Sequence, residues 1–478
     1  MATYKLSAIT DGLSIEVDDD EIFIFNTVNT IRIYDDVLEE INVSRGSLIF
    51  TLTVSNTVNE SGSAFASYDA LKSFIINAWD IGKLPYVTSF DEQLSAFRSS
   101  QMNFKPTWGV TTYRYKKTTT GSGAAAAETN GEFRLQSGTA TSNVASIETN
   151  QRGQYQAGAM GQAGIGCRIP TNPTSTQYAK WGYSDFSQNG FYFGIDATGI
   201  YVAYITGGSE TKTYQDNWNG DKLNGTGDSG LTLSLANGAI SQIDFIWYGY
   251  GDITFSFIIF DANTLKSQKV TAHTLKINGS ASIIDPNQPL KFEVGNGASS
   301  SSNFSLYIGG HQFSTVDGFS TPQKRIISEL LTNYTTATNV LWQPLIAFRK
   351  KSTFNSRVNS VNAFLESFTV SADGEIETRI TRGGNTSNLD WATPTGCTAT
   401  ETAIETKITT STALTTSADG SPIDYGFVNA TKTASNTFAT EVNIILGSDE
   451  EIILWIRRLS DTGGIVIKHA HLTWKEEW

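Results

Sequence analysis

Hydrophobic and polar residues alternate in short runs over most of this chain, and glycine, asparagine and aspartate close the runs. The pattern is densest over residues 151–260, where aromatic residues stand beside glycines and helical periodicity is almost absent. Such runs predict β-strands joined by tight turns. A glycine beside an aromatic lets a backbone pass close to a large ring, as happens inside sandwiches and barrels. We therefore expect a large β-sandwich over residues 131–342.

Residues 343–478 repeat the strand-rich pattern, and about seven short strands over this length fit a smaller C-terminal β-sandwich. Between the two parts, residues 326–334 favour a helix. The clearest strands of the large sandwich are expected at residues 133–135, 190–193, 199–205, 240–247, 253–260 and 290–294. Those of the smaller one are expected at residues 364–370, 376–380, 405–409, 440–446, 452–457 and 466–473.

The N-terminal part, residues 1–82, has the pattern of a small α+β domain. Strand-like runs at 21–25, 30–34 and 47–54 precede an amphipathic helix expected over 68–79, in which Leu71, Phe74, Ile75 and Ala78 share one face. A unit of this size is marginally stable alone, so we expect it to anchor on something larger. Residues 83–130 are expected to be a connector, and the low-complexity run at 121–127 a flexible loop.

Composition narrows the functional classes. Charged residues make up 17% of the 478 residues, below the ~25% typical of soluble domains. A net charge of −13 and the lack of clustered Lys and Arg argue against a nucleic-acid partner. Cys167 and Cys397 are expected to be small buried hydrophobes without a disulfide. No run reaches the ~20 apolar residues of a membrane span, and we expect no export signal at the start of the chain.

Candidates for catalysis or metal binding are weak. A glycosidase needs two carboxylates in a cleft, but the available acids are expected to be turn and surface residues: Glu132, Glu148, Asp185, Asp196, Asp221 and Glu293. The segment 216–221 fails as an EF-hand loop, because Trp218 takes the third position and Gly220 the fifth. His469 and His471 share one strand face without a nearby third ligand. We predict no catalytic, cofactor-binding or metal-binding residues and no cofactor.

Exposed aromatic residues could form a platform for sugar rings. Strand alternation turns most of them into the core, and Trp218 and Tyr250, each in a glycine-rich turn, are the better surface candidates. The full set is Trp181, Tyr183, Tyr192, Tyr201, Tyr204, Trp218, Trp247, Tyr248 and Tyr250.

Several aromatic and glycine clusters follow one another in a specific order. They lie at residues 148–158, 180–183, 190–196, 218–225, 229–231, 243–245, 247–251, at His273 and at 286–289. In this order they resemble a module of many tailed-bacteriophage virion proteins. Residues 348–349 and 472–476 are similar to the C-terminal sandwich that often follows that module. The resemblance covers about residues 130–478 and leaves the first ~100 residues outside it.

The resemblance implies a concanavalin-like, jelly-roll β-sandwich carried on phage heads, necks or tails as a fibre, decoration or adhesin-type protein without enzyme activity. We therefore expect a virion structural protein that assembles in the host cytoplasm. Its N-terminal domain would dock on capsid, neck or tail proteins, and the chain would form a homo-oligomer, a dimer or trimer. Alternatives are a lectin-like receptor-binding protein for host glycans and, third, a glycan depolymerase. Neither nucleic-acid binding nor membrane insertion is expected.

Overall fold

The chain divides into two compact units, residues 1–95 and residues 96–478. The computed structural model describes five short strands of the first unit and most of the second. In the second unit, the described residues are 98–477 without 262–265, 277–282, 300–301, 317–323, 337–340, 385–390, 409–419, 430–432, 438–444, 448–449 and 460–463.

The described strands of the first unit form two small sheets. In one, β1 (Tyr4–Leu6) pairs antiparallel with β2 (Leu13–Val17), and β2 pairs parallel with β5 (Leu48–Phe50). In the other, β3 (Ile24–Phe25) pairs with β4 (Thr30–Ile31). The helix expected over 68–79 lies outside the described residues.

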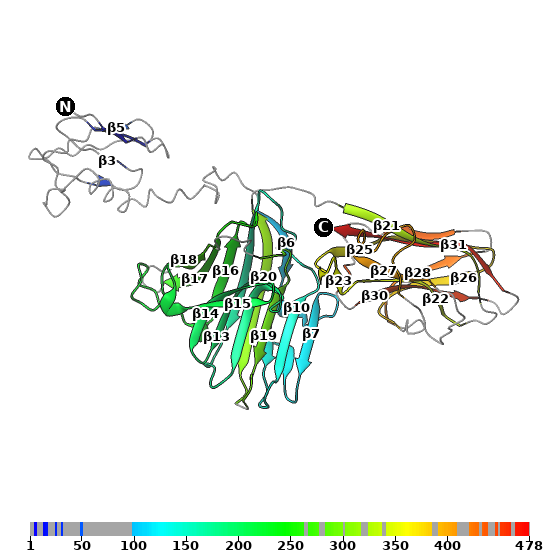
Figure 1. The fold of residues 1–478 in the computed structure, drawn as a ribbon, viewed down its shortest axis with the longest axis horizontal. Helices are drawn as coiled ribbons and strands as arrows, with labels where there is room; N and C mark the ends of the chain where they lie inside the picture. Colours follow the sequence, from blue (N-terminus) through cyan, green and yellow to red (C-terminus); the bar gives the residue numbers. More distant parts are fainter. Residues whose placement is uncertain are drawn as a thin grey trace, which may run out of the picture. The chain divides into compact units, whose positions relative to one another are not determined.

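The second unit begins with a large sandwich of two antiparallel sheets (Figure 1). The seven-stranded sheet has the order β15 (Ser209–Tyr214), β14 (Gly199–Thr206), β13 (Asn189–Asp196), β12 (Tyr178–Ser184), β19 (Leu290–Gly295), β10 (Val144–Thr149) and β7 (Tyr115–Thr120). The eight-stranded sheet has the order β18 (Lys266–Leu275), β17 (Ile253–Asp261), β16 (Ala239–Phe245), β11 (Met160–Arg168), β20 (Ser305–Val316), β9 (Glu132–Gln136) and β8 (Ala125–Thr129), with β6 (Arg98–Phe104) also paired to β20. Single 3-10 turns lie at η1 (Pro106–Trp108), η2 (Gln215–Asn217) and η3 (Leu235–Asn237).

Aromatic rings fill the space between these sheets. Trp181 and Phe193 from the seven-stranded sheet stack with ring centroids 6.0 Å apart, and Tyr183 lies 4.6 Å from Phe313 of the facing sheet. Alternation sends every second side chain inward, so one face of each strand supplies this core. The expected role of glycine also holds, because a Cβ at Gly161 would lie only 2.5 Å from the Phe245 ring. The strands expected in this sandwich are confirmed, with shifted ends.

Residues 83–130, expected to be a connector and a flexible loop, contain three strands of the large sandwich. Strands β6, β7 and β8 lie within residues 83–130 and pair with β20, β10 and β9 of the sandwich. Ala125, Ala126 and Ala127 belong to β8, so the alanine run is a strand of a hairpin. Low complexity led to the wrong interpretation, because backbone pairing with β9 needs no large side chain.

A smaller sandwich follows, with a four-stranded and a five-stranded sheet around one apolar core. The first sheet has the order β21 (Lys324–Thr335), β31 (Val466–Glu477), β25 (Asn362–Ala372) and β29 (Thr433–Thr437). The second has the order β27 (Ile404–Ile408), β22 (Gln343–Lys350), β30 (Glu451–Arg458), β26 (Ile376–Arg382) and β28 (Ser421–Val428). A short hairpin joins β23 (Thr353–Phe354) to β24 (Arg357–Val358). The predicted strand at 440–446 lies mostly outside the described residues.

The helix expected over 326–334 is wrong. These residues lie in β21, which pairs along its length with β31. Ile326, Ile327, Leu330 and Leu331 have helix-like spacing, but only Ile327 of these is buried, while Ile326 and Leu330 are exposed. Pairing with a strand from the end of the chain overrides local periodicity. Because β21 belongs to the smaller sandwich, that sandwich begins near residue 324 rather than 343.

Candidate functional site

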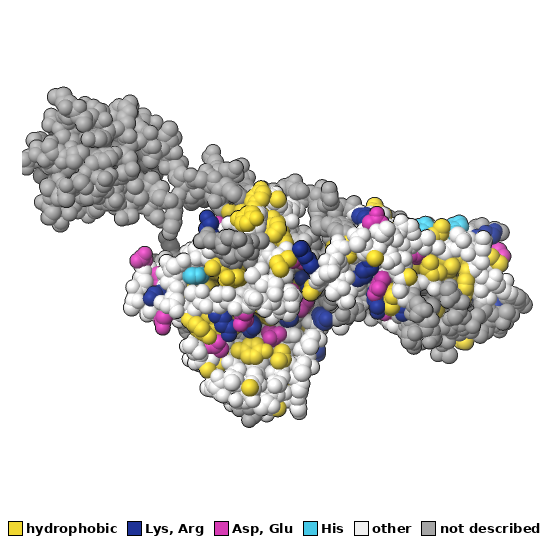
Figure 2. All heavy atoms as spheres, in the orientation of Figure 1, with side chains coloured by type: hydrophobic (Ala, Val, Ile, Leu, Met, Phe, Trp, Pro, Cys, Tyr) yellow, Lys and Arg dark blue, Asp and Glu magenta, His cyan; other side chains and the backbone are white. Residues whose placement is uncertain are grey.

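Charged side chains form a connected row on the outer face of the seven-stranded sheet. Lys180 Nζ lies 2.8 Å from Glu210 Oε1. Lys212 Nζ lies 3.3 Å from Asp196 Oδ2 and 3.8 Å from Glu210 Oε2. In the space-filling view, basic and acidic side chains gather over β13, β14 and β15 (Figure 2). The two ammonium groups are thus balanced by two carboxylates, and each such partly exposed pair contributes little to stability, about 0–1 kcal/mol.

Strand alternation puts these residues together. The neighbouring residues Ala179 and Trp181 face the core, so Tyr178 and Lys180 on β12 point outward. On β15, Lys212 lies opposite Ala203 of β14, and Tyr214 lies opposite Tyr201. The outer face of this edge of the sheet therefore carries alternating charges and rings.

A second, smaller aromatic cluster lies beneath the charges. It consists of Tyr192, Tyr201, Ala203 and Ile205, all buried, with Phe186 and Tyr214 packed against them. Lys212 Nζ lies 4.4 Å from the centre of the Tyr201 ring, and Lys180 Nζ lies 5.3 Å from that of Tyr192. Such cation–π contacts are worth about 0.5–2 kcal/mol each. The lysine stems thus cover aromatic surface that lies outside the main core.

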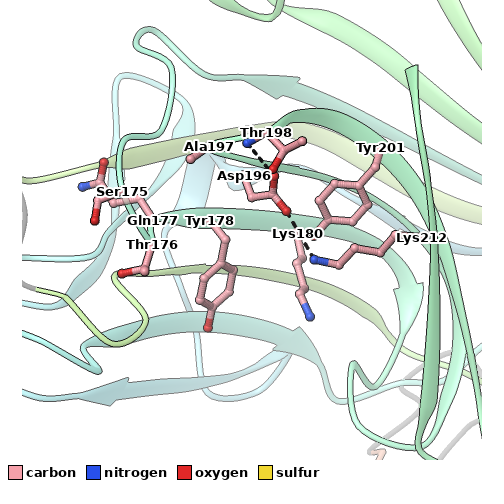
Figure 3. Close-up of a pocket in the computed structure, with 10 residues that line it drawn as sticks. All are labelled: Ser175, Thr176, Gln177, Tyr178, Lys180, Asp196, Ala197, Thr198, Tyr201 and Lys212. Atoms are coloured by element: carbon pink, nitrogen blue, oxygen red, sulfur yellow. Dashed lines mark hydrogen bonds and ion pairs between the residues drawn. The ribbon is translucent and has the colours of Figure 1, made fainter. Parts of the chain in front are cut away.

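A cavity of about 540 Å³ opens at the end of this row, and we call it the first hollow. Figure 3 shows the ion pair of Asp196 and Lys212, with Tyr178 on one side of it and Tyr201 on the other. The residues that line the first hollow are Ser175, Thr176, Gln177, Tyr178, Lys180, Asp196, Ala197, Thr198, Tyr201 and Lys212. Hydroxyl, amide, carboxylate, ammonium and aromatic groups thus converge on one small cavity.

Among the residues that line the first hollow, Tyr201 has a side-chain hydroxyl that lacks a hydrogen bond. It is buried and has no hydrogen-bond partner among the described residues. The other tyrosine hydroxyls nearby are bonded: that of Tyr178 donates to Glu293 over 3.1 Å and that of Tyr214 donates to Asp196 over 2.9 Å. An unpaired buried hydroxyl costs about 1–3 kcal/mol, which a bound hydrogen-bonding group would recover.

Both carboxylates of the row are held in the ionised form. Burial opposes ionisation of Asp196, but hydrogen bonds from the Tyr214 hydroxyl and the Thr198 amide, with the Lys212 charge, outweigh it and lower the pKa. Burial likewise opposes ionisation of Glu210, and hydrogen bonds from Lys180 and Tyr192 lower its pKa. A general acid needs the opposite shift, so neither carboxyl is suited to donate a proton near neutral pH.

Of the six acidic candidates, two are connected to the first hollow. Asp196 lines the first hollow, and Glu293 accepts the hydrogen bond of Tyr178. The other four hold turns or ion pairs. Glu132 pairs with Arg168, Glu148 with Lys291, the Asp185 carboxylate accepts the amides of residues 187–189, and Asp221 accepts those of Leu223 and Ser229.

Of the two aromatic residues expected at the surface, one is buried and one is exposed. Trp218 is buried, stacks near Phe257 and donates its indole N–H to the Thr213 carbonyl, so it is not a surface residue. Tyr250 is exposed, as expected, at 68% of its surface. It lies outside the lining of the first hollow. Sequence reasoning missed Tyr178, Lys180, Glu210 and Lys212. Only Tyr178 and Lys180 carried a signal, because they alternate with the core residues Ala179 and Trp181.

The cysteines and the paired histidines, the other residues considered from the sequence, lie outside the first hollow. The thiols of Cys167 and Cys397 are both free, the first buried and the second only partly so. His469 and His471 lie on β31. In the described parts of the chain, no group of three or more His, Cys, Asp or Glu side chains comes together in a way that could hold a metal ion. Within those same parts, no helix has the length and apolar character to cross a membrane.

No protein-family model and no curated protein matches the sequence. Among solved structures, the legume lectin-like domain from Entamoeba histolytica aligns at 8% identity, covering 42% of this chain and 89% of its own, with a TM-score of 0.27. The endo-β-1,4-glucuronan lyase from Trichoderma reesei aligns at 10% identity, covering 45% of this chain and 94% of its own, with a TM-score of 0.26. A protein of unknown function from Shewanella oneidensis MR-1 aligns at 10% identity, covering 54% of this chain and 98% of its own, with a TM-score of 0.30.

The described parts of the chain are mostly β and form two β-sandwiches, as expected. These three neighbours align at 8–10% identity with TM-scores of 0.26–0.30, and such a likeness assigns no function. What each of them binds or cleaves says nothing about the first hollow.

Proposed function

We propose that this chain is a non-enzymatic recognition protein of a tailed-phage virion, which binds host-surface glycan through the first hollow. The N-terminal unit attaches it to other virion proteins, and the sandwiches project as a homo-oligomer. The glycan-binding part of the proposal is carried by one observation, the buried and unpaired Tyr201 hydroxyl in a polar, aromatic cavity.

Sugars suit such a cavity for chemical reasons. A pyranose offers hydroxyls that both donate and accept hydrogen bonds, and it offers flat C–H faces that pack on rings. In the first hollow, the exposed Ser175 and the half-buried Tyr178 ring both line the cavity, whereas the Thr176 hydroxyl and the Gln177 amide already donate to Asn296. The Tyr201 hydroxyl is closed to solvent, so a sugar hydroxyl becomes its partner only when covering side chains, such as Lys212 over the ring, move aside. Such a partner would recover the desolvation cost of the hydroxyl.

Binding without cleavage fits the charge state of the cavity. A retaining or inverting glycosidase needs one protonated carboxyl near neutral pH, whereas the pKa values of Asp196 and Glu210 are both lowered. We expect no release of reducing sugar from any glycan that binds. Release that is lost in an Asp196→Asn variant would contradict this part of the proposal.

The assignment to a virion is supported by the ordered aromatic and glycine clusters of residues 148–289. These clusters resemble the phage virion module, and their core members lie on the sandwich strands. Mass spectrometry of tailed particles purified from the source organism should find peptides of this chain. Their absence from such particles, with the chain present in the cell extract, would contradict the virion assignment.

The glycan-binding assignment is tested on a glycan array with the full chain. We expect selective binding that falls about tenfold in Tyr201→Phe, since that change removes one hydrogen bond and keeps the ring. The unliganded Tyr201→Phe protein should be as stable as the wild type, because the lost hydroxyl has no partner. The matched control is Tyr307→Phe, a half-buried tyrosine of β20 on the other sheet. No binding to any glycan, or equal binding by both variants, would contradict the proposal.

A further inference from the structure

A second cavity lies directly beside the first hollow. It measures about 510 Å³, and we call it the second hollow. The two cavities share Asp196, Ala197 and Thr198, which form the turn between β13 and β14. Ala197 and Thr198 are both exposed. The turn is therefore a low ridge with a cavity on either side of it.

The second hollow differs from the first in its chemistry. Leu233, Leu235 and Ala236 give it an apolar wall at η3, and Asn172, Gln215 and Ser234 add amide and hydroxyl groups. Asp196 is its single charged lining residue. A lining of this kind suits a sugar unit, which presents C–H faces and hydroxyls but no charge.

The charges of the first hollow are already satisfied within the protein. Lys212 is paired with Asp196 and Glu210, and Lys180 is paired with Glu210. An anionic sugar would have to compete with these carboxylates for the two ammonium groups, which costs free energy. Neither cavity therefore offers an unpaired cation to an acidic glycan.

Resting on the glycan-binding function proposed above, we infer that the site takes a neutral, linear oligosaccharide that crosses the Asp196–Thr198 ridge, with sugar units in both hollows. A single sugar fills one hollow only. Affinity must then rise with chain length until both hollows are occupied and level off beyond that.

The test uses the full chain and isothermal titration with cello-, manno- and malto-oligosaccharides of one to six units, together with oligogalacturonides of the same lengths as the anionic series. We expect one neutral series to gain at least about tenfold in affinity between one and four units, and the anionic series to bind more weakly at each length. A hexamer that binds no more tightly than the single sugar would overturn the inference, as would tighter binding of the oligogalacturonides. Absence of binding by every probe would instead overturn the glycan-binding function itself.

One variant isolates the second hollow. Ala236→Trp places a large ring in that cavity from an exposed position, away from the first hollow. We expect it to lower the affinity for the hexamer to that for the single sugar, while binding of the single sugar stays unchanged. Ala127→Trp, at an exposed position of β8, is the matched control and should bind every length as the wild type does. If Ala236→Trp keeps the full gain with chain length, the second hollow holds no sugar.

Discussion

Gly194 and Tyr201 lie opposite each other on the neighbouring strands β13 and β14, and the tyrosine ring covers the glycine. A Cβ at residue 194 would lie 2.3 Å from Tyr201 Cζ and 2.5 Å from its hydroxyl oxygen. The ring can therefore lie flat on the outer face of the sheet only because residue 194 has no side chain. This contact holds Tyr201 in the lining of the first hollow, with its hydroxyl closed to solvent.

Gly194→Ala should therefore displace the Tyr201 ring. We expect a loss of about 1–3 kcal/mol in the free energy of unfolding, as for other overpacked sites, together with weaker glycan binding. Gly310→Ala is the matched control, because a Cβ at that strand glycine meets nothing within 4 Å. Chemical denaturation of both variants measures the difference. Equal stability of the two variants would show that the ring does not depend on Gly194.

Lowering the pH should reduce the free energy of unfolding, because protonation of Asp196 removes its ion pair with Lys212. The pKa of Asp196 is lower in the folded chain than in the unfolded one, so its contribution to stability is present above about pH 4 and is lost as pH falls through the folded value. Asp196→Asn should be less stable than the wild type at pH 7, and the difference should shrink below about pH 4. Urea titrations between pH 2 and 7 measure this difference. The exposed Asp228→Asn change is the control and should show no such convergence.

The stability of the large sandwich should also depend on pH through His311, at a higher pH than through Asp196. This histidine is buried between the sheets, with Nε2 3.0 Å from the Tyr115 hydroxyl and Nδ1 3.0 Å from the Gly309 carbonyl. Burial lowers its pKa from 6.5 to about 4, although the Gly309 hydrogen bond opposes the shift. Between these values the unfolded chain binds the extra proton, so the large sandwich should lose up to about 3 kcal/mol as pH falls from 6.5 to 4.

Hydrogen–deuterium exchange of β9 and β20 follows this loss in the large sandwich separately from the rest of the chain. In His311→Gln the slope of stability with pH between 4 and 6.5 should flatten, whatever the change in stability at pH 7. His469→Gln, exposed on β31 of the smaller sandwich, should keep the slope of the wild type. An unchanged slope in His311→Gln would rule out this histidine as the source.

A buried hydrogen bond between Trp181 and Ser241 links the two sheets of the large sandwich, and its contribution to stability can be measured. The indole N–H of Trp181 donates to Ser241 Oγ over 3.0 Å, and both residues are buried. Ser241→Ala leaves that indole without a partner, so we expect a loss of about 1–3 kcal/mol in the free energy of unfolding. Ser209→Ala, exposed on β15, should cost almost nothing. Guanidinium unfolding followed by tryptophan fluorescence compares the two, and equal values would contradict the link.

The sequence by itself determined many strands of both sandwiches and the role of glycine beside large rings. Alternation and turn residues are local signals, so residues 190–193, 199–205 and 253–260 could be identified without knowledge of their partners. The same alternation indicated that most of the aromatic set lies in the core, and Trp181 and Tyr183 do. These features depend on neighbouring residues in the chain, which is why a sequence pattern carries them.

Tertiary structure decided the features that depend on distant partners. The alanine run became β8 because β9 pairs with it, and residues 326–334 became β21 because β31 pairs with them. Trp218 is buried although its turn is rich in glycine, because Phe257 and the Thr213 carbonyl meet it there. The first hollow exists only where β12, β13, β14 and β15 bring Lys180, Asp196, Tyr201 and Lys212 together. Register across four strands is a long-range property, and no local pattern of residues encodes it.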